Sequence, residues 1–195
     1  MTEELEKKLY DEFPKLFKQK DLSMRETCMC WGCSCDDGWY SILYDTCTII
    51  NDMISLNIHL YPQVEFGQVK EKFGTLRIYF DQFPLSKEKF LETDEARRSY
   101  EYNIPLWVRI FSKIKQSIKE NYMYKKYLKN ISKHYSFFDD VIDYAEYLSA
   151  KTCEVCGNSG VLCGRGGWLK TLCENHMKEE DYQVYKSKRL SDKGI

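Results

Sequence analysis

The sequence predicts an α+β fold, in which amphipathic helices pack on a small antiparallel β-hairpin sheet and a compact module follows at the C-terminal end. Apolar residues recur with helical spacing from about residue 38 to residue 56. They alternate with polar residues on both sides of a turn signal between residues 63 and 80, and paired Cys and His residues follow residue 151. We therefore expect a core domain over residues 1–150 and a separate module over residues 151–195.

The composition is that of a globular protein. The chain has 195 residues, of which 43% are hydrophobic and 15% aromatic, so it can bury one core and is not a disordered chain. The net charge of -1 argues against indiscriminate binding of nucleic acid through bulk charge. No apolar run reaches the length of a membrane span, and the first residues do not resemble an export signal. We therefore expect a cytoplasmic protein with no membrane partner.

Four amphipathic helices are expected in the core domain. The first covers residues 2–13 and is stopped by Pro14. The longest runs from Gly38 to Leu56, after a pair of aspartates that suit a helix start. Two more follow later in the chain, one continuing from Trp107 past Ile118 and one over residues 139–149. Their apolar stripes are expected to form the core.

The stretch from Gln63 to Phe80 is expected to form a β-hairpin. Val64 and Phe66 alternate with polar residues before the turn, and an apolar alternation resumes after a Lys-Phe-Gly turn at residues 72–74. This periodicity sends Leu76, Ile78 and Phe80 inward.

The outer face of this hairpin is a candidate binding surface. It would carry Lys70, Lys72, Arg77 and Tyr79, which together suit an anion such as a phosphate group. The same pattern is also typical of a solvated hairpin, so both interpretations stay open.

Four cysteines are crowded near the N-terminus, at Cys28, Cys30, Cys33 and Cys35. A second metal ion could bind there, but the spacing C-x-C-x2-C-x-C is cramped for one tetrahedral ion without ligands from elsewhere. We favour the alternative, a strand or turn whose thiols pack as small hydrophobic residues. The chain has nine cysteines in total, an odd number, and we expect no disulfides.

The segment from residue 104 to residue 135 is strongly basic. It has eight Lys or Arg residues against one acid, a charge of about +7, which leaves about -8 for the rest of the chain. Four tyrosines are interleaved with these lysines, at Tyr122, Tyr124, Tyr127 and Tyr135. Such a face can stack bases and neutralise phosphates, or it can simply be solvated.

The C-terminal module contains the clearest chemical signal. Cys153 and Cys156 form a C-x2-C pair, and Cys173 and His176 form a second pair after a spacer of sixteen residues. Three thiolates and one imidazole make a closed tetrahedral set that suits one structural Zn2+ ion and leaves no position open for substrate. The spacer reads as a hairpin that turns at residues 164–167 and places Trp168 and Leu172 on one apolar face, and a helix is expected from Glu174 to about residue 190. Knuckle, hairpin and helix resemble a treble-clef zinc finger, with Cys163 as a core residue outside the ligand set.

Three stretches together resemble a known family. They are DDGWYSIL at residues 36–43, VKEKFGTLRIYF at residues 69–80, and AEYLSAKTCEVCG with GWLKTLCENH at residues 145–176. In this order they resemble a family of small phage and prophage proteins with a GW helix, a KEKFG-LR-Y hairpin and a terminal zinc finger. The resemblance implies a phage-encoded accessory protein in the bacterial host cytoplasm, with zinc held by Cys153, Cys156, Cys173 and His176. The region from about residue 85 to residue 138 would be an insertion or a divergent stretch.

The expected function is non-enzymatic. A zinc-stabilised phage accessory protein would use the hairpin face to bind a host protein or a phosphate-bearing small ligand, by analogy in counter-defence. The alternatives are nucleic-acid binding through residues 104–135 and a metal-dependent nuclease. A nuclease needs an open metal position and a general base, yet His59 and His134 belong to no catalytic motif and no Gly-rich phosphate loop is present.

Overall fold

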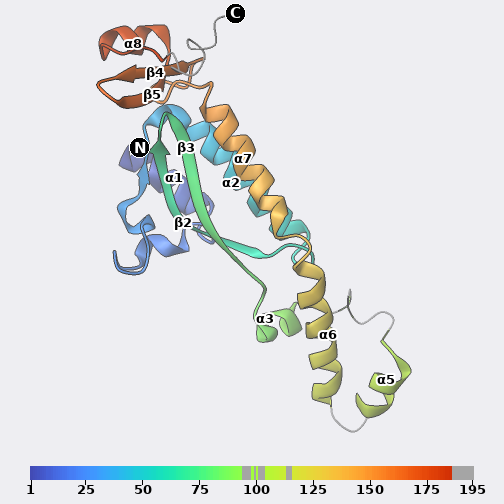
Figure 1. Cartoon of the computed structure of the whole chain (residues 1–195). Helices are drawn as coiled ribbons and strands as arrows, with labels where there is room; N and C mark the ends of the chain where they lie inside the picture. Colours follow the sequence, from blue (N-terminus) through green and yellow to red (C-terminus); the bar gives the residue numbers. More distant parts are fainter. Residues whose placement is uncertain (94–97, 99, 101–103, 113–115, 186–195) are drawn as a thin grey trace, which may run out of the picture.

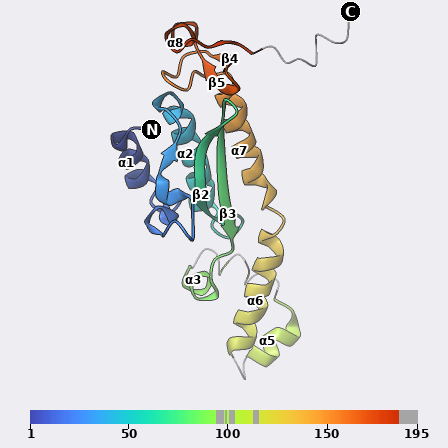
Figure 2. The same cartoon turned by 60° about the vertical axis from the view of Figure 1, so that its left-hand side comes forward.

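The computed structural model describes residues 1–93, 98, 100, 104–112 and 116–185. Figures 1 and 2 show three parts along one long axis. A central body contains the main sheet, the C-terminal module (residues 151–185) lies at one end, and an arm (the described residues between 85 and 135) extends from the other. The fold is mixed α and β with small sheets.

The helices are α1 (Glu3–Glu12), α2 (Tyr40–Leu56), α3 (Lys87–Glu92), α5 (Leu106–Ser112), α6 (Gln116–Ile131), α7 (Ser136–Ser149) and α8 (Glu174–Glu179). Short 3-10 turns are η1 (Lys18–Asp21), η2 (Met29–Trp31) and η3 (Asp37–Trp39). The strands are β1 (Cys33–Ser34), β2 (Gln63–Lys72), β3 (Thr75–Phe83), β4 (Val161–Arg165), β5 (Trp168–Leu172) and β6 (Gln183–Val184). The expected helices at residues 2–13, 38–56 and 139–149 are therefore confirmed as α1, α2 and α7.

The body sheet is built on the expected hairpin. Strands β2 and β3 pair antiparallel, and the turn lies at Phe73 and Gly74, both with positive φ. The short strand β1 adds a parallel neighbour on the other side of β2. The alternation of β3 buries Leu76 and Ile78 as predicted, while Phe80 is only partly buried at the edge of the core.

The main core lies between the sheet and the helices. Helix α7 packs against both α2 and β3, so the two helices and the hairpin enclose one apolar cluster. The stripe predicted on α2 forms much of it, since Leu43 and Ile50 are fully buried. Trp39, in the turn that leads into α2, is also fully buried.

The arm has a small core of its own. Its buried residues are Leu85, Phe90, Tyr100, Met123, Tyr127 and Ile131. The single helix expected from Trp107 past Ile118 is instead two helices, α5 and α6, which pack against each other (Figures 1 and 2). Residues 113–115, which join them, lie outside the described residues. None of the described helices is both long and apolar enough to span a membrane.

The C-terminal module holds a second small sheet with strand order β5-β4-β6. Its hairpin turns at Gly166 and Gly167, both with positive φ, as the sequence predicted. The following helix is much shorter than expected, because α8 ends at Glu179 and Asp181 takes a φ of 56°. The chain then returns as β6, and residues 186–195, which the predicted helix also covered in part, lie outside the described residues.

Candidate metal centre

Four side chains converge in the C-terminal module, and they are the four that the sequence predicted. The sulfur atoms of Cys153, Cys156 and Cys173 and one ring nitrogen of His176 all lie within 4.8 Å of one another. The Nδ1 atom of His176 is 3.2 Å from the Cys173 sulfur and 3.5 Å from the Cys153 sulfur. Four potential ligand atoms at this spacing could hold one metal ion.

The local backbone brings these ligands together. Gly157 follows the first pair with a φ of 77°, and its amide donates to the Cys153 carbonyl at 2.9 Å. This tight turn directs both thiols to the same side. Cys173 is the N-cap residue of α8, which places His176 one turn later on the same face of the helix.

The surroundings favour the thiolate form at Cys173 and disfavour it at Cys153. The backbone amide of His176 and the neighbouring ligand side chains lower the pKa of Cys173 to about 7. At Cys153 burial dominates and raises the pKa, although backbone amides of Cys173 and Cys156 act in the opposite direction. The side-chain amide of Asn158 also donates to the Cys156 sulfur at 3.4 Å. Amides that point at sulfur are the usual environment of a metal-bound thiolate.

The first docking contact of the module is the Gly-Trp pair before α2. The Gly38 amide donates to the Glu154 carbonyl at 2.7 Å, and the Trp39 indole donates to the Thr152 carbonyl at 2.8 Å. A Cβ atom on Gly38 would lie 2.3 Å from the Cys153 carbonyl oxygen. Only glycine permits this approach, so the knuckle that holds two ligands is seated directly on the body.

The second docking contact is the tip of the body hairpin. The Thr171 hydroxyl donates to the Gly74 carbonyl at 2.6 Å, and a Cβ atom on Gly74 would lie 2.4 Å from a methyl carbon of Leu162. Close by, the Ser149 hydroxyl accepts a hydrogen bond of 2.8 Å from the Leu76 amide and so ties the end of α7 to β3. The three stretches that carry the family resemblance therefore meet at one place in the fold.

A buried carboxylate lies beneath the metal ligands. Glu154 is 3% exposed, and one of its oxygens accepts from the Asp36 amide at 3.3 Å. Burial, reinforced by the nearby charge of Asp36, raises the pKa of Glu154 to about 7, while Lys170 acts in the opposite direction. The Lys170 ammonium is 3.4 Å from both Asp36 and Glu180. This charged cluster links Asp36 of the body to Glu154 and Lys170 of the module.

The N-terminal cysteines do not form a second centre. Among the described residues, only the C-terminal group brings three or more ligand side chains together. Cys33 and Cys35 are buried in the main core and therefore pack as small hydrophobic residues, the alternative that we favoured from the sequence. In contrast, Cys28 is exposed and Cys30 is only partly buried. Cys163 is likewise fully buried and lies outside the metal group.

The candidate hairpin residues do share one face, but they differ in how they are engaged. Lys70 lies opposite Arg77 in the hairpin register, and its ammonium is 5.2 Å from the centroid of the Tyr79 ring. Arg77 forms an ion pair of 2.6 Å with Glu146 on α7. Arg77 is therefore neutralised within the protein, which the sequence could not show. Lys70 and Lys72 form no ion pair with the described residues.

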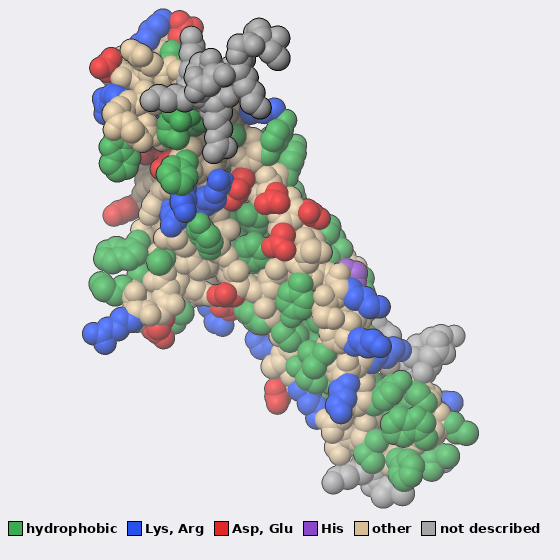
Figure 3. Space-filling model, in the orientation of Figure 1, with side chains coloured by type: hydrophobic (Ala, Val, Ile, Leu, Met, Phe, Trp, Pro, Cys, Tyr) green, Lys and Arg blue, Asp and Glu red, His purple; other side chains and the backbone are tan. Residues whose placement is uncertain are grey.

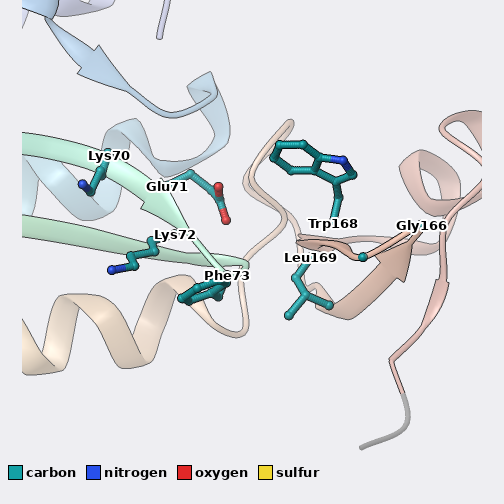
Figure 4. A pocket seen from close by; sticks show the side chains of 8 residues that line it. Lys70, Glu71, Lys72, Phe73, Gly166, Trp168 and Leu169 are labelled. Atoms are coloured by element: carbon teal, nitrogen blue, oxygen red, sulfur yellow. The ribbon is translucent and has the colours of Figure 1, made fainter.

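A cavity of about 580 Å³ lies beside the contact between the hairpin tip and the C-terminal module and is lined by residues of both. In Figure 4 the side chains of Phe73 and Leu169 face each other across it, and the Glu71 carboxylate points toward Trp168. The Lys70 and Lys72 ammonium groups point away from Trp168. Trp168 and Phe73 are 77% and 67% exposed, so the apolar face expected for Trp168 and Leu172 is open to solvent at Trp168, while Leu172 is buried.

Sequence reasoning did not single out Phe73 as part of this surface. The sequence did place Phe73 in a tight turn. A turn residue with positive φ lies at the end of the hairpin and away from the core, and this position could have indicated an exposed aromatic side chain.

No protein-family model, curated protein or solved structure matches this chain.

Proposed function

We propose that this protein is a non-enzymatic binding protein, stabilised by one structural zinc ion, that holds a phosphate-bearing small ligand on its hairpin face. We now define the hairpin face as Lys70, Lys72, Phe73 and Tyr79: Arg77, which the sequence had placed on it, is left out because Glu146 neutralises it, and Phe73 is added. The chemistry of the donor set supports zinc. Three thiolates with one imidazole are typical of structural zinc, and Zn–S bonds of about 2.3 Å imply tetrahedral edges of about 3.8 Å. The sulfur atoms of Cys156 and Cys173 are 3.8 Å apart.

The arrangement of the module supports a treble-clef-like finger. Two ligands come from a knuckle, two from the start of a short helix, and a hairpin lies between them in the chain. All four coordination positions would be filled by protein atoms, so the ion would organise the fold and would not activate water. This argues for a structural role and against the nuclease alternative.

The observation that carries the proposed binding role is the pair of lysines without acidic partners. Lys70 and Lys72 lie on one face, and their ammonium groups are 5.2 Å and 5.5 Å from the ring centroids of Tyr79 and Phe73. Among the described residues no carboxylate pairs with either lysine, in contrast to Arg77. Two unneutralised cations beside exposed rings suit a ligand with phosphate groups and a flat body.

A titration with pyrophosphate and with nucleoside triphosphates, followed by calorimetry, tests this proposal. We expect stoichiometric binding by the zinc-loaded protein and at least a tenfold loss when Lys70 and Lys72 are both changed to Ala. The matched control changes Lys125 and Lys129, which lie on the arm, to Ala and so removes the same charge elsewhere. Equal affinity in the two double variants would exclude the hairpin face. No binding of any phosphate compound would redirect the search to a protein partner.

The phage resemblance supports a role in the bacterial host cytoplasm, where sequestering a phosphate-bearing ligand or occupying a host protein would suit counter-defence. Nucleic-acid binding by the arm is the alternative proposal. It would rest on the lysines, because Tyr127 is buried in the arm core and the Tyr124 hydroxyl donates to the Leu85 carbonyl. A steep loss of affinity with salt is its test, since neutralised phosphates release counterions.

A further inference from the structure

Helix α5 presents an unusual apolar surface at the free end of the arm. Its four large hydrophobic side chains, Leu106, Trp107, Ile110 and Phe111, are 71%, 55%, 53% and 51% exposed. Within this helix only Val108 is buried. Figure 3 shows hydrophobic side chains gathered as one patch at the tip of the arm, and Figure 1 shows α5 at the opposite end of the molecule from β4, β5 and α8.

Folding of the described chain does not account for this patch. The arm core is formed by other residues, and none of the four belongs to it. The ring of Trp107 makes one edge-to-face contact with Tyr122 of α6, at 5.9 Å between centroids. Contiguous apolar surface of this kind on a monomer commonly marks a site of interaction with a protein or a membrane.

The patch lies beside a basic helix. Helix α6 carries four lysines, at positions 119, 125, 126 and 129, against the single acid Glu120, a charge of about +3. Lys125, Lys126 and Lys129 are exposed. Figure 3 shows Lys and Arg side chains along the arm next to the apolar tip. The occupant of this surface should therefore be apolar inside and negatively charged at its border.

A second copy of this chain fits these requirements poorly. Tip-to-tip pairing would bring two basic α6 helices together. Tip-to-body pairing could use the cavity of about 600 Å³ between body and arm, but its lining combines Lys15, Lys18 and Lys89 with Glu65 and Glu92 and so offers the arm no net negative charge. An anionic lipid bilayer fits better, because its surface accepts a protruding apolar wedge while its headgroup phosphates attract the lysines.

We propose that the α5 tip attaches the protein to anionic membranes, with its four apolar side chains in the interfacial layer and the exposed Lys125 and Lys129 of α6 at the headgroups. This is peripheral attachment, which the composition did not suggest, since we expected no membrane partner. The apolar face arises from the way a short helix folds back on α6. It goes beyond the proposed ligand binding and uses a different surface.

Co-sedimentation of the full chain with vesicles tests this proposal. The vesicles are an equal mixture of phosphatidylglycerol and phosphatidylcholine, or phosphatidylcholine alone. We expect binding to the anionic vesicles only, decreasing with salt, and about tenfold or more weaker when Trp107 and Phe111 are both changed to Ser. The matched control changes Trp31 and Tyr144, which are 67% and 60% exposed elsewhere, to Ser and should bind as the wild type does.

A second variant keeps the test independent of arm folding. Lys125→Glu with Lys129→Glu leaves the apolar face intact and should abolish the preference for anionic vesicles, while circular dichroism reports the helix content. Equal sedimentation with both vesicle types, or equal loss in the control, would overturn the proposal. A concentration-dependent dimer that disappears in the Trp107 and Phe111 variant would assign the face to a second copy and also overturn it.

Discussion

Changing Gly38 to Ala is the sharpest test of how the C-terminal module is held. The new Cβ atom would lie 2.3 Å from the Cys153 carbonyl oxygen, 2.5 Å from the Glu154 carbonyl oxygen and 2.5 Å from the Gly157 amide nitrogen. All three neighbours are backbone atoms of the metal-binding knuckle, so no flexible side chain can move aside. The module must shift away from the body, or the turn before α2 must distort.

The expected cost follows from the contacts that such a shift breaks. Overpacking of a tight site costs about 1–3 kcal/mol. The shift also weakens the hydrogen bonds from the Gly38 amide and the Trp39 indole, each worth about 1 kcal/mol. We therefore expect a loss of about 3 kcal/mol in the free energy of unfolding. If docking and metal binding are coupled, the same energy corresponds to a metal affinity lower by roughly a hundredfold.

Urea unfolding of the metal-loaded protein measures the first quantity, and competition with a chromophoric chelator measures the second. Gly67→Ala is the control. A Cβ atom there would meet its nearest neighbour, an oxygen of Gln19, at an ordinary 3.5 Å. This substitution should change stability by less than about 1 kcal/mol and leave metal affinity unchanged. If Gly38→Ala behaves like Gly67→Ala in both assays, the close approach does not hold the module and the reasoning fails.

Three further predictions concern other parts of the molecule. Ser149→Ala should lower the free energy of unfolding by about 1–3 kcal/mol in a urea titration, because the buried Leu76 amide loses its acceptor. The control Ser132→Ala, on the exposed arm surface, should lower it by less than about 0.5 kcal/mol, and equal effects of the two changes would contradict the role of Ser149. Cys156→Ser should expose residues 151–185 to limited proteolysis while the body stays resistant, whereas an unchanged digestion pattern would mean that the ion does not stabilise the module. Iodoacetamide at neutral pH should label the exposed Cys28 well before Cys35, since burial raises the pKa of Cys35 to about 12. Peptide mass spectrometry measures the order of labelling, and equal labelling rates would refute this prediction.

Local patterns in the sequence predicted much of this fold because they depend on neighbouring residues. Helical spacing located α2, alternation located β2 and β3, and two short Cys and His spacings named all four residues of the metal group. Each signal lies within one element or one turn. The buried tryptophan of the Gly-Trp pair was expected in the core for the same reason.

Features that depend on distant segments could not be predicted in this way. The pairing of Arg77 with Glu146 joins residues 69 positions apart, and it removes a charge that the hairpin pattern alone had offered to a ligand. The end of α8 is set by Asp181 and by the return of β6 to β4, which periodicity does not record. The exposed face of α5 looked like a core stripe, because spacing shows that a helix is amphipathic but not what covers its apolar side.

The contacts that hold the C-terminal module on the body also have a consequence for folding during synthesis. The hydrogen bonds among them join Asp36 to Glu154, Trp39 to Thr152 and Gly74 to Thr171, across separations of 118, 113 and 97 positions. A nascent chain therefore contains Gly38 and Gly74 long before the segment that covers them, whereas α7, which completes the body core, is synthesised immediately before that segment. Closing such long loops carries an entropic cost that only late contacts repay. Until then the Gly38 amide and the Trp39 indole lack their acceptors in the module, and a chain truncated before residue 151 would leave both without these acceptors permanently.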